Sequence, residues 1–314
     1  MKAAQIKKYG GSEVVEINNN APKPAVSEGH LLIEVHAAGI NPVDWKIREG
    51  YMAQMIPLKF PATLGGDFSG VVVEVGGGVS GFKKGDEVYG QAGALRGGSG
   101  SFAEFVLADI KVTARKPKNI DHVEAAALPL TGVSAWQALV DHIGLSRGKK
   151  ILIHGGAGGI GTVAIQLAKH LAAYVATTAG AKDMQYVQEL GADEVIDYKN
   201  QSFQDMLKNF DAVFDTVGGD TYEKSFKVLR KGGIIVSMLE QPNQKLMNQF
   251  GVNAIGQFTQ VNSERLSRVA ELAEKRVIKV HVDKTYPLEQ AGEALEFLQT
   301  GHPRGKLVLK IKKN

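Results

Sequence analysis

The sequence predicts an α/β protein with two parts, a strand-rich unit and a doubly wound parallel sheet. Short β-branched runs separated by glycine and proline turns fill the first third of the chain. Strand and helix patterns alternate from about residue 123, and a strand pattern returns at the C-terminal end. A length of 314 residues fits about two domains. We therefore expect one domain over residues 1–122, completed by residues 271–314, and a second over residues 123–270.

The first domain is predicted from four short runs in which β-branched residues or alternating apolar residues dominate. These runs cover residues 31–35, 71–75, 86–89 and 102–107. No helical pattern separates them, so antiparallel pairing in a barrel or sandwich is favoured over strand–helix–strand repeats.

The second domain is predicted from a strand–helix rhythm, which indicates a parallel sheet covered by helices on both faces. The expected strands are 150–154, 174–178, 194–198, 212–215 and 234–238. The expected helices are centred on residues 160–171, 184–190, 203–210 and 222–229. Later residues predict a helix at 266–272, a strand at 277–282, a helix at 288–298 and an alternating strand at 307–311, which we expect to complete the first unit.

The composition excludes several classes of function. Lysine and arginine number 37 against 33 aspartates and glutamates, too small an excess to indicate nucleic-acid binding. The absence of cysteine excludes disulfides, thiolate nucleophiles, iron–sulfur clusters and cysteine-containing zinc sites. The longest charge-free stretch, 125–140, is too short and polar to cross a membrane. We expect a cytoplasmic protein that binds neither membranes nor nucleic acid.

Glycines gather where the first strand of the alternating region ends. The segment Gly156-Ala157-Gly158-Gly159-Ile160-Gly161 matches the pattern G-x-G-x-x-G. It follows a strand pattern and opens a helix pattern, which is the context in which such a turn holds a dinucleotide pyrophosphate. Thr162 stands where a mononucleotide phosphate loop has lysine. A dinucleotide site is therefore favoured over an ordinary glycine-rich turn.

The end of the next strand indicates which dinucleotide binds. NAD sites usually carry an acidic residue there, but this strand ends in Thr178, Gly180 and Lys182 without one. Lys182 is placed to meet a 2′-phosphate, and Tyr198 ends the following strand beside the same position. NADPH is favoured over NADH. A solvated lysine and a half-buried core tyrosine are the alternative interpretations of these two residues.

Several segments, in this order and spacing, resemble the medium-chain dehydrogenase/reductase family, most closely its zinc-independent quinone oxidoreductase branch. They are Gly39-Ile40-Asn41-Pro42-Val43-Asp44, Leu64-Gly65-Gly66-Asp67-Phe68-Ser69-Gly70, Gly85-Asp86-Glu87-Val88-Tyr89-Gly90, Leu128-Pro129-Leu130-Thr131 and Gly305-Lys306-Leu307-Val308-Leu309. The resemblance covers nearly the whole chain. It implies a GroES-like catalytic domain, an inserted NADP-binding Rossmann domain and a homodimer.

The resemblance departs from the zinc-dependent alcohol dehydrogenases of the same family. Those enzymes hold zinc with cysteine and with the histidine of a Gly-His-Glu segment, whereas Gly66 stands in the matching position here. The eight histidines show no i, i+4 pair typical of metal ligands. We therefore expect no metal site.

Without a Lewis acid, an electron-poor acceptor suits the predicted chemistry best. A quinone or an α,β-unsaturated carbonyl accepts hydride at carbon and needs only a hydrogen bond at oxygen, so the protein mainly orients the reactants. NADPH-dependent reduction of such an acceptor is the predicted reaction. An enoyl-thioester or alkenal reductase and a catalytically idle NADPH-binding sensor are the alternatives.

The resemblance also implies roles for individual residues. Asn41 is expected near the nicotinamide ribose and the substrate, and Tyr51 is a candidate donor to the acceptor oxygen. A turn asparagine and a tyrosine in the wall of the site are the alternatives. The remaining residues expected around the cofactor are Thr131, Val217, Ser237, Phe258 and Lys306.

Overall fold

The computed structural model describes residues 1–55, 57–93 and 99–312. Contacts divide the chain into two compact units. The strand-rich unit comprises Met1–Leu130, Val261–Arg276 and Val280–Asn314, and the parallel-sheet unit comprises Thr131–Gln260 and Val277–Lys279. The α/β fold class predicted from the sequence is confirmed.

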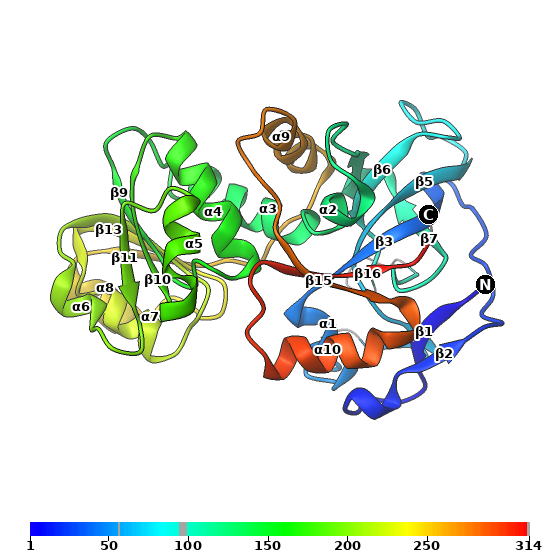
Figure 1. The fold of residues 1–314 in the computed structure, drawn as a ribbon, viewed down its shortest axis with the longest axis horizontal. Helices are drawn as coiled ribbons and strands as arrows, with labels where there is room; N and C mark the ends of the chain where they lie inside the picture. Colours follow the sequence, from blue (N-terminus) through cyan, green and yellow to red (C-terminus); the bar gives the residue numbers. More distant parts are fainter. Residues whose placement is uncertain (56, 94–98, 313–314) are drawn as a thin grey trace. The chain divides into compact units, whose positions relative to one another are not determined.

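The strand-rich unit is built around one large, mainly antiparallel sheet with the strand order β15-β16-β3-β5-β6-β8, and β7 also pairs with β3 (Figure 1). The strands are β3 (His30–Ile40), β5 (Asp67–Val75), β6 (Glu87–Gln91), β7 (Phe105–Asp109), β8 (Thr113–Arg115), β15 (Val282–Pro287) and β16 (Lys306–Lys310). A smaller sheet joins β2 (Glu16–Asn18), β1 (Ala3–Ile6) and β4 (Ala62–Thr63). Because β16 pairs antiparallel with β3, the C-terminal segment belongs to the same sheet as the N-terminal one.

Strand β3 organises the core of this unit. Leu31, Ile33 and Val35 pack into one apolar cluster with residues of β5 and β6, whereas Ala38 and Ile40 pack into another. Both clusters are buried from solvent, which fixes the strand along its whole length. The end of β3 is therefore held rigidly where helix α1 (Pro42–Arg48) begins. The other helices of the unit are α2 (His122–Ala126), α9 (Ser263–Glu274) and α10 (Ala291–Thr300).

The parallel-sheet unit has the strand order β11-β10-β9-β12-β13-β14, and every pairing is parallel. The strands are β9 (Lys150–Ile153), β10 (Tyr174–Ala179), β11 (Glu194–Asp197), β12 (Phe210–Asp215), β13 (Leu229–Ser237) and β14 (Asn253–Gly256). In chain order this is the 3-2-1-4-5-6 arrangement of dinucleotide-binding folds. Ligands bind such sheets at the carboxyl ends of the strands, where the order reverses between β9 and β12.

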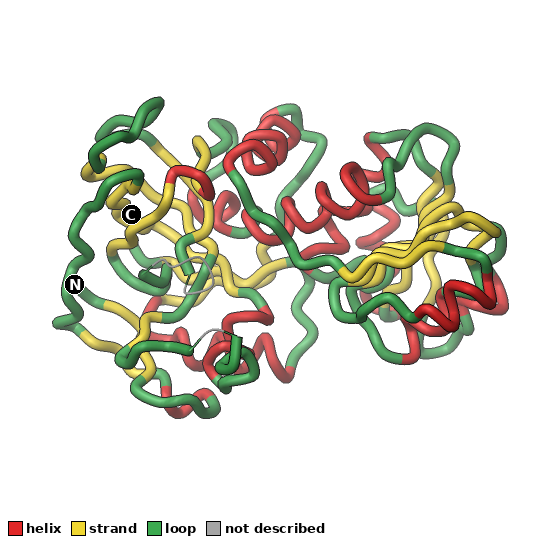
Figure 2. Tube along the Cα trace, turned by 180° about the vertical axis from the view of Figure 1, so that it is seen from behind, coloured by secondary structure: helices red, strands yellow, loops and turns green. Residues whose placement is uncertain are grey.

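Helices cover both faces of this sheet (Figure 2). The helices are α4 (Gly159–His170), α5 (Met184–Glu189), α6 (Phe203–Met206), α7 (Asp220–Ser225) and α8 (Gln244–Phe250), and α3 (Pro129–Trp136) continues as a π-helix over Gln137–His142. Residues of α6, α7 and α8 share one apolar cluster with β9, β12 and β13, while α4 packs on β9 and β10. The apolar strands are thus buried from both sides, as the sequence rhythm predicted.

Several predicted elements differ from the structure. Residues 277–281 form no strand, and β15 begins only at Val282. The reason lies in Gln166 of α4, whose side chain accepts from Lys279 N at 2.9 Å and donates to Lys279 O at 3.1 Å, so that these backbone groups pair with a side chain. The predicted helices at 203–210 and 222–229 are shorter, because Phe210 and Leu229 already belong to β12 and β13.

The predicted domain boundaries stay predictions, and the contact-based units differ from them mainly at α9. Residues 261–270 follow the parallel sheet in sequence, yet α9 packs on β8 of the strand-rich unit. The hydroxyl of Tyr89 donates to Leu266 O at 2.5 Å and fastens the helix to β6. Within the described residues, no helix is both long and apolar enough to span a bilayer.

Candidate functional site

The glycine turn joins β9 to α4 and carries few side chains. Gly155 has a φ of +70°, and Gly158 caps the N-terminus of α4. A Cβ at Gly156 would collide with Thr177 Oγ1, and one at Gly161 would collide with Gly155 O, so these two glycines permit internal packing. A Cβ at Gly158 would meet only Gly155 O, at 3.3 Å. A Cβ there would be in tight contact with this backbone oxygen, so glycine suits the position, and its lack of a side chain allows the close approach that a phosphate requires at the helix N-terminus.

Gly159 and Ile160 are the first residues of α4, so the whole G-x-G-x-x-G segment lies at the strand-to-helix turn predicted from the sequence.

The ends of β10 and β11 bring three further predicted residues to the same sheet edge. Ala179 pairs with Asp197, so Gly180 and Tyr198 follow directly from neighbouring positions. A Cβ at Gly180 would lie 3.8 Å from Tyr198 Cε1, which shows that the ring flanks this glycine. Tyr198 is half exposed, and Lys182 is exposed two residues beyond Gly180.

The side chain of Thr178 points into the interior of the parallel-sheet unit. Its hydroxyl is buried, lies 3.1 Å from His154 Nδ1 and accepts from Gly155 N at 3.2 Å. The side chain therefore supports the glycine turn from inside the unit.

The later strands contribute both apolar and polar residues. Val217 and Phe258 follow β12 and β14 with about half of their surfaces exposed, and Leu239, which the sequence patterns did not single out, is similarly exposed after β13. Ser237 is buried and donates to Asp215 Oδ2 at 2.7 Å. These apolar side chains lie at the ends of strands where a parallel sheet binds ligands.

Asp215 and Thr131 are both buried. Asp215 Oδ1 accepts from the backbone of Val217 and Gly218 at 3.0 Å each, so this carboxylate shapes the turn that presents Val217. Thr131 is buried in the first turn of α3.

In the strand-rich unit, Asn41 is the centre of a buried polar cluster. Asn41 caps α1: its backbone N–H donates to Asp44 Oδ2 at 2.7 Å, and Pro42 opens the helix. Asn41 Nδ2 donates to Asp67 Oδ2 at 3.0 Å, and Lys306 Nζ donates to Asn41 Oδ1 at 2.5 Å. An ammonium can only donate and a carboxylate accepts, so the Asn41 amide has a single orientation.

The partners of Asn41 come from distant parts of the sequence. Asp67 also accepts from Gln91 Nε2 at 2.7 Å and from Leu130 N at 3.1 Å, and Lys306 also donates to Ile40 O. Lys306 thus directs its ammonium toward the end of β3. Gln91 was not among the residues singled out from the sequence.

Burial dominates the electrostatics of this cluster. Loss of hydration raises the pKa of Asp44 to about 7 and raises that of Asp67, while it lowers the pKa of Lys306. The neighbouring opposite charges counteract burial in each case, since Lys306 lowers the pKa values of both carboxyl groups. Lys306 therefore favours the charged form of both carboxyl groups, whereas the nearby charge of Asp67 raises the pKa of Asp44 further.

A pocket opens beside this cluster. Its lining includes Asn41, Asp44, Leu58, Gly66 and Gln91. A Cβ at Gly66 would meet nothing within 4 Å, so Gly66 leaves room in this wall of the pocket. Tyr51, by contrast, is 74% exposed and packs its ring edge on Trp45, and among the described residues it is not part of this lining.

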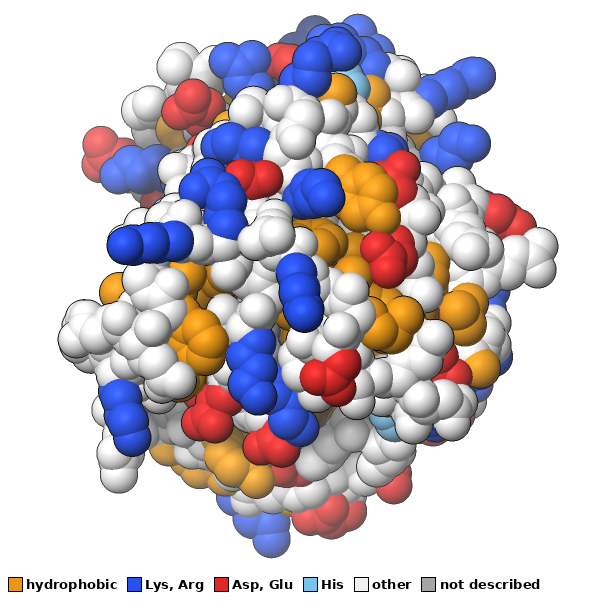
Figure 3. Space-filling view, turned by 90° about the vertical axis from the view of Figure 1, so that its left-hand side faces the viewer, with side chains coloured by type: hydrophobic (Ala, Val, Ile, Leu, Met, Phe, Trp, Pro, Cys, Tyr) orange, Lys and Arg blue, Asp and Glu red, His pale blue; other side chains and the backbone are white. Residues whose placement is uncertain are grey.

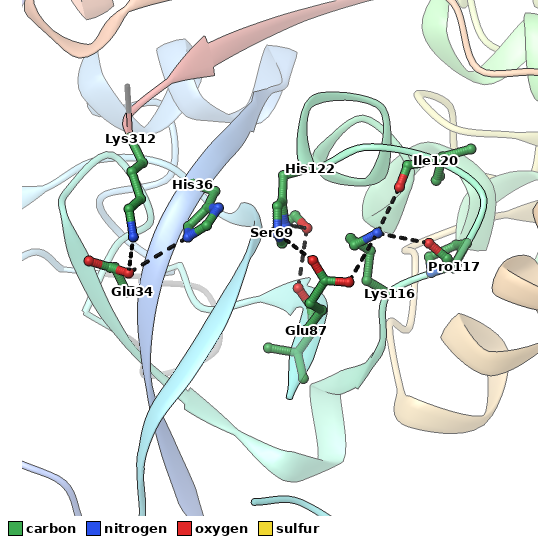
Figure 4. A network of polar contacts seen from close by, with 10 residues as sticks. Glu34, His36, Ser69, Glu87, Lys116, Pro117, Ile120, His122 and Lys312 are labelled. Atoms are coloured by element: carbon green, nitrogen blue, oxygen red, sulfur yellow. Dashed lines mark hydrogen bonds and ion pairs between the residues drawn. The ribbon is translucent and has the colours of Figure 1, made fainter. Parts of the chain in front are cut away.

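A second polar network lies in the same unit, around two neighbouring histidines whose rings are tilted relative to each other (Figure 4). The rings of His36 and His122 lie 4.3 Å apart, and His122 contacts Ser69 Oγ at 2.8 Å and Glu87 Oε1 at 3.1 Å. Burial lowers the pKa of His122 to about 4 and lowers that of His36 as well. Across the part of the chain that the structure describes, no group of three or more acidic or histidine side chains is arranged to hold a metal ion.

The strand order and glycine turn are those of a dinucleotide-binding protein. Comparison with known proteins identifies the family within this class. A family model described as alcohol dehydrogenase GroES-like domain matches residues 27–118, and one described as zinc-binding dehydrogenase matches residues 190–309. The 2-methylene-furan-3-one reductase of Solanum lycopersicum is 39% identical over 98% of this chain and 79% of its own length.

Two further relatives agree with this result. The chloroplastic NADPH-dependent alkenal/one oxidoreductase of Arabidopsis thaliana is 38% identical over 98% of this chain and 79% of its own length. The structure of the quinone oxidoreductase from Coxiella burnetii is 35% identical, covers 99% of each chain and superposes with a TM-score of 0.92. The chain belongs to the medium-chain dehydrogenase/reductase superfamily, in its zinc-independent quinone oxidoreductase-like branch. It is an oxidoreductase.

Proposed function

We propose that this protein transfers hydride from NADPH to the electron-poor carbon of a quinone or an α,β-unsaturated carbonyl. The observation that carries the proposal is the Asn41 amide, held in one orientation beside a pocket that Gly66 leaves open. The names of the tomato, Arabidopsis and Coxiella relatives, which refer to furanone, alkenal and quinone substrates, support the same acceptor class.

The residues of the parallel-sheet unit fit a phosphorylated dinucleotide. Gly156, Gly158, Gly159, Ile160 and Gly161 would hold the pyrophosphate on bare backbone at the start of α4. Lys182, Gly180 and Tyr198 form the proposed site for the 2′-phosphate and adenine, with the ammonium supplying a charge-assisted hydrogen bond. When bound, NADPH supplies the hydride.

The apolar residues after the later strands are proposed to flank the nicotinamide. Val217, Leu239 and Phe258 provide exposed apolar surface, while Thr131 lies in the first turn of α3. For Thr178 and Ser237, whose hydroxyls are engaged inside the unit, we propose contact with the cofactor through the backbone. For Lys306 we propose orientation of Asn41 in place of direct cofactor binding, because its ammonium donates to Asn41 and Ile40.

On the acceptor side, Asn41 is proposed to donate to the developing oxyanion. One N–H of its Nδ2 is bonded to Asp67, and the second is the proposed donor to the acceptor oxygen. Because Lys306 and Asp67 fix the amide beforehand, no reorientation is needed during the reaction. The proton that completes reduction comes from solvent, and Tyr51 is a second proposed donor to the oxygen.

A panel of acceptors tests this proposal. Stopped-flow oxidation of NADPH and NADH is followed with 1,4-benzoquinone, 9,10-phenanthrenequinone, 2-hexenal and crotonyl-CoA. Turnover with the quinones or the enal supports the proposal, and exclusive turnover of crotonyl-CoA supports an enoyl-thioester reductase. Tight NADPH binding without turnover on any acceptor indicates a sensor and contradicts the proposal.

The cellular location and the absence of nucleic-acid or membrane partners are also proposals. We retain the cytoplasm as the proposed location, although the Arabidopsis relative is named as chloroplastic. On the face of the protein drawn in Figure 3, Lys and Arg side chains are interspersed with Asp and Glu side chains. Such mixing gives no single-sign surface on that face for nucleic acid or anionic lipid.

A further inference from the structure

His154 lies directly before the glycine turn, inside the parallel-sheet unit, and is fully buried. Both ring nitrogens have partners: Nδ1 lies 3.1 Å from Thr178 Oγ1, and Nε2 lies 2.9 Å from Ser225 Oγ. The ring also packs edge-on against Phe203, with 4.6 Å between the ring centres. A buried histidine with two specific partners has one preferred tautomer.

The tautomer follows from the partners. Ser225 Oγ donates its only hydrogen to Thr221 O at 2.6 Å, so it must accept from His154 Nε2. Nδ1 then carries the lone pair, and the Thr178 hydroxyl donates to it. The Thr178 oxygen in turn accepts from Gly155 N. Four hydrogen bonds therefore run in one direction, from Gly155 N–H through Thr178, His154 and Ser225 to Thr221 O of α7.

This chain of hydrogen bonds acts on the first residue of the glycine turn. Gly155 adopts a φ of +70°, which glycine tolerates readily, and Gly156 N donates to Thr178 O at 3.0 Å. Thr216 Oγ1 donates to His154 O at 2.8 Å, which ties the same point to the end of β12. The start of the turn is thus fastened to β10, β12 and α7 through His154 and Thr178.

We propose that His154, as the neutral Nε2–H tautomer, is a positioning residue that holds the glycine turn in its cofactor-binding conformation through Thr178. This inference rests on the proposed function of the turn as the pyrophosphate site. It assigns His154 no contact with the reactants. Desolvation lowers the pKa of His154 to about 4, so the ring is neutral under ordinary assay conditions.

Substitutions at His154 separate its two hydrogen bonds. His154→Asn keeps an acceptor near the Nδ1 position, and His154→Gln keeps a donor near the Nε2 position, whereas His154→Leu keeps neither. We expect His154→Leu and His154→Gln to raise the NADPH dissociation constant about tenfold, and His154→Asn to stay within about threefold of wild type. The KM for the acceptor stays unchanged. Equal losses in all three variants, or an unchanged dissociation constant in His154→Leu, would overturn the proposal.

Thr178→Val provides the matched control, because it removes the link between His154 and the turn. The double variant with His154→Leu should bind NADPH no more weakly than either single variant, since both remove the same interaction. Additive losses would show that His154 acts by another route.

Two measurements without cofactor keep this inference distinct from the proposed function. Ring ¹⁵N chemical shifts of His154 report the tautomer, and a proton on Nδ1 contradicts the inference. Amide hydrogen exchange at Gly155 and Gly156 should accelerate in His154→Leu while exchange in β13 is unchanged, and equal protection in both proteins contradicts it. If wild type binds no NADPH, the proposed function fails, and these two measurements still decide whether His154 orders the turn.

Discussion

At the scale of single residues, the exposed ammonium of Lys182 is expected to distinguish the two nicotinamide cofactors. We predict that Lys182→Ala weakens NADPH binding about tenfold and leaves NADH binding unchanged, because only NADPH carries the 2′-phosphate. Isothermal titration calorimetry with both cofactors measures this difference. Lys208→Ala is the matched control. It removes an exposed lysine just before β12, at the amino ends of the strands, whereas Lys182 lies at their carboxyl ends. Equal losses for NADPH and NADH would remove Lys182 from the phosphate site.

Asn41 is expected to control the chemical step. We predict that Asn41→Ala lowers kcat about 100-fold while NADPH affinity stays the same, because the oxyanion loses its preorganised donor. Single-turnover kinetics and a cofactor titration give the two quantities. Thermal unfolding of the variant is the control, since the change removes one hydrogen bond each from the buried groups Lys306 and Asp67. A kcat near that of wild type in a folded variant would contradict the assignment.

Tyr51 provides a weaker test at the same scale. We predict that Tyr51→Phe lowers the turnover number with nearly unchanged NADPH affinity, because it removes only a hydroxyl donor. The ring keeps its contact with Trp45 in this variant, so folding is preserved. An unaltered rate would limit Tyr51 to the wall of the site.

The residues differ in how far sequence could identify them. Asn41 stood out through a short motif, but its partners Asp67 and Lys306 are 26 and 265 residues away, and no local pattern connects them. His154 also carried no signal, because a single histidine in an apolar strand resembles a core residue. Its hydrogen bonds depend on strand pairing that only the fold creates.

At the scale of elements, two glycines of the turn between β9 and α4 are expected to serve different purposes, Gly158 in cofactor binding and Gly161 in folding. We predict that Gly158→Val abolishes NADPH binding, because its side chain would stand at the start of α4, where the pyrophosphate is proposed to approach. Circular dichroism should show a folded protein, and calorimetry should show no binding heat. Gly161→Val is the contrasting variant, since its Cβ collides with the turn's own backbone and should destabilise the protein. Retained NADPH affinity in Gly158→Val would count against the cofactor assignment.

Element prediction worked where burial is periodic and failed where a side chain replaced a partner strand. The alternating region gave β9 to β13 and the helices between them in the correct order, because each of these strands is covered on both faces, but α8 and the edge strand β14 were not predicted. The segment 277–281 has the composition of a strand, yet Gln166 satisfies Lys279 and prevents ladder formation there. The hydrogen bonds between Gln166 and Lys279 join residues 113 positions apart, and hydrophobic periodicity cannot predict such a contact.

At the scale of the whole molecule, buried neutral histidines make stability depend on pH. The folded-state pKa of His154 is lowered to about 4 from 6.5, so the unfolded chain binds more protons between these values and stability falls as pH decreases through this window. Asp44 contributes with the opposite sign, because its folded-state pKa is raised to about 7. A comparison with His154→Asn isolates the histidine, since Asp44 is common to both proteins.

We predict that wild type loses about 2 kcal/mol of unfolding free energy relative to His154→Asn between pH 7 and pH 5. Urea unfolding at the two pH values measures this difference. A difference that does not change with pH would show that His154 is protonated equally in the folded and unfolded states.

The proposed homodimer is also a property of the whole molecule. Strand β14 ends the parallel sheet, and we predict that two copies associate through this edge, as the family resemblance implies. Multi-angle light scattering at the assay concentration should give twice the chain mass of 33.7 kDa. A monomer mass would contradict this prediction and leave the rest unaffected.

The placement of β16 has a consequence for biosynthesis. During synthesis β3 emerges before β16, with the whole parallel-sheet unit synthesised between them. Until then residues 37–40 of β3 lack the partner strand β16, and Asn41 lacks the ammonium of Lys306. The nascent chain can therefore complete its dinucleotide fold while the acceptor pocket is still unfinished. During this interval the unpaired end of β3 is open to misassociation with other chains.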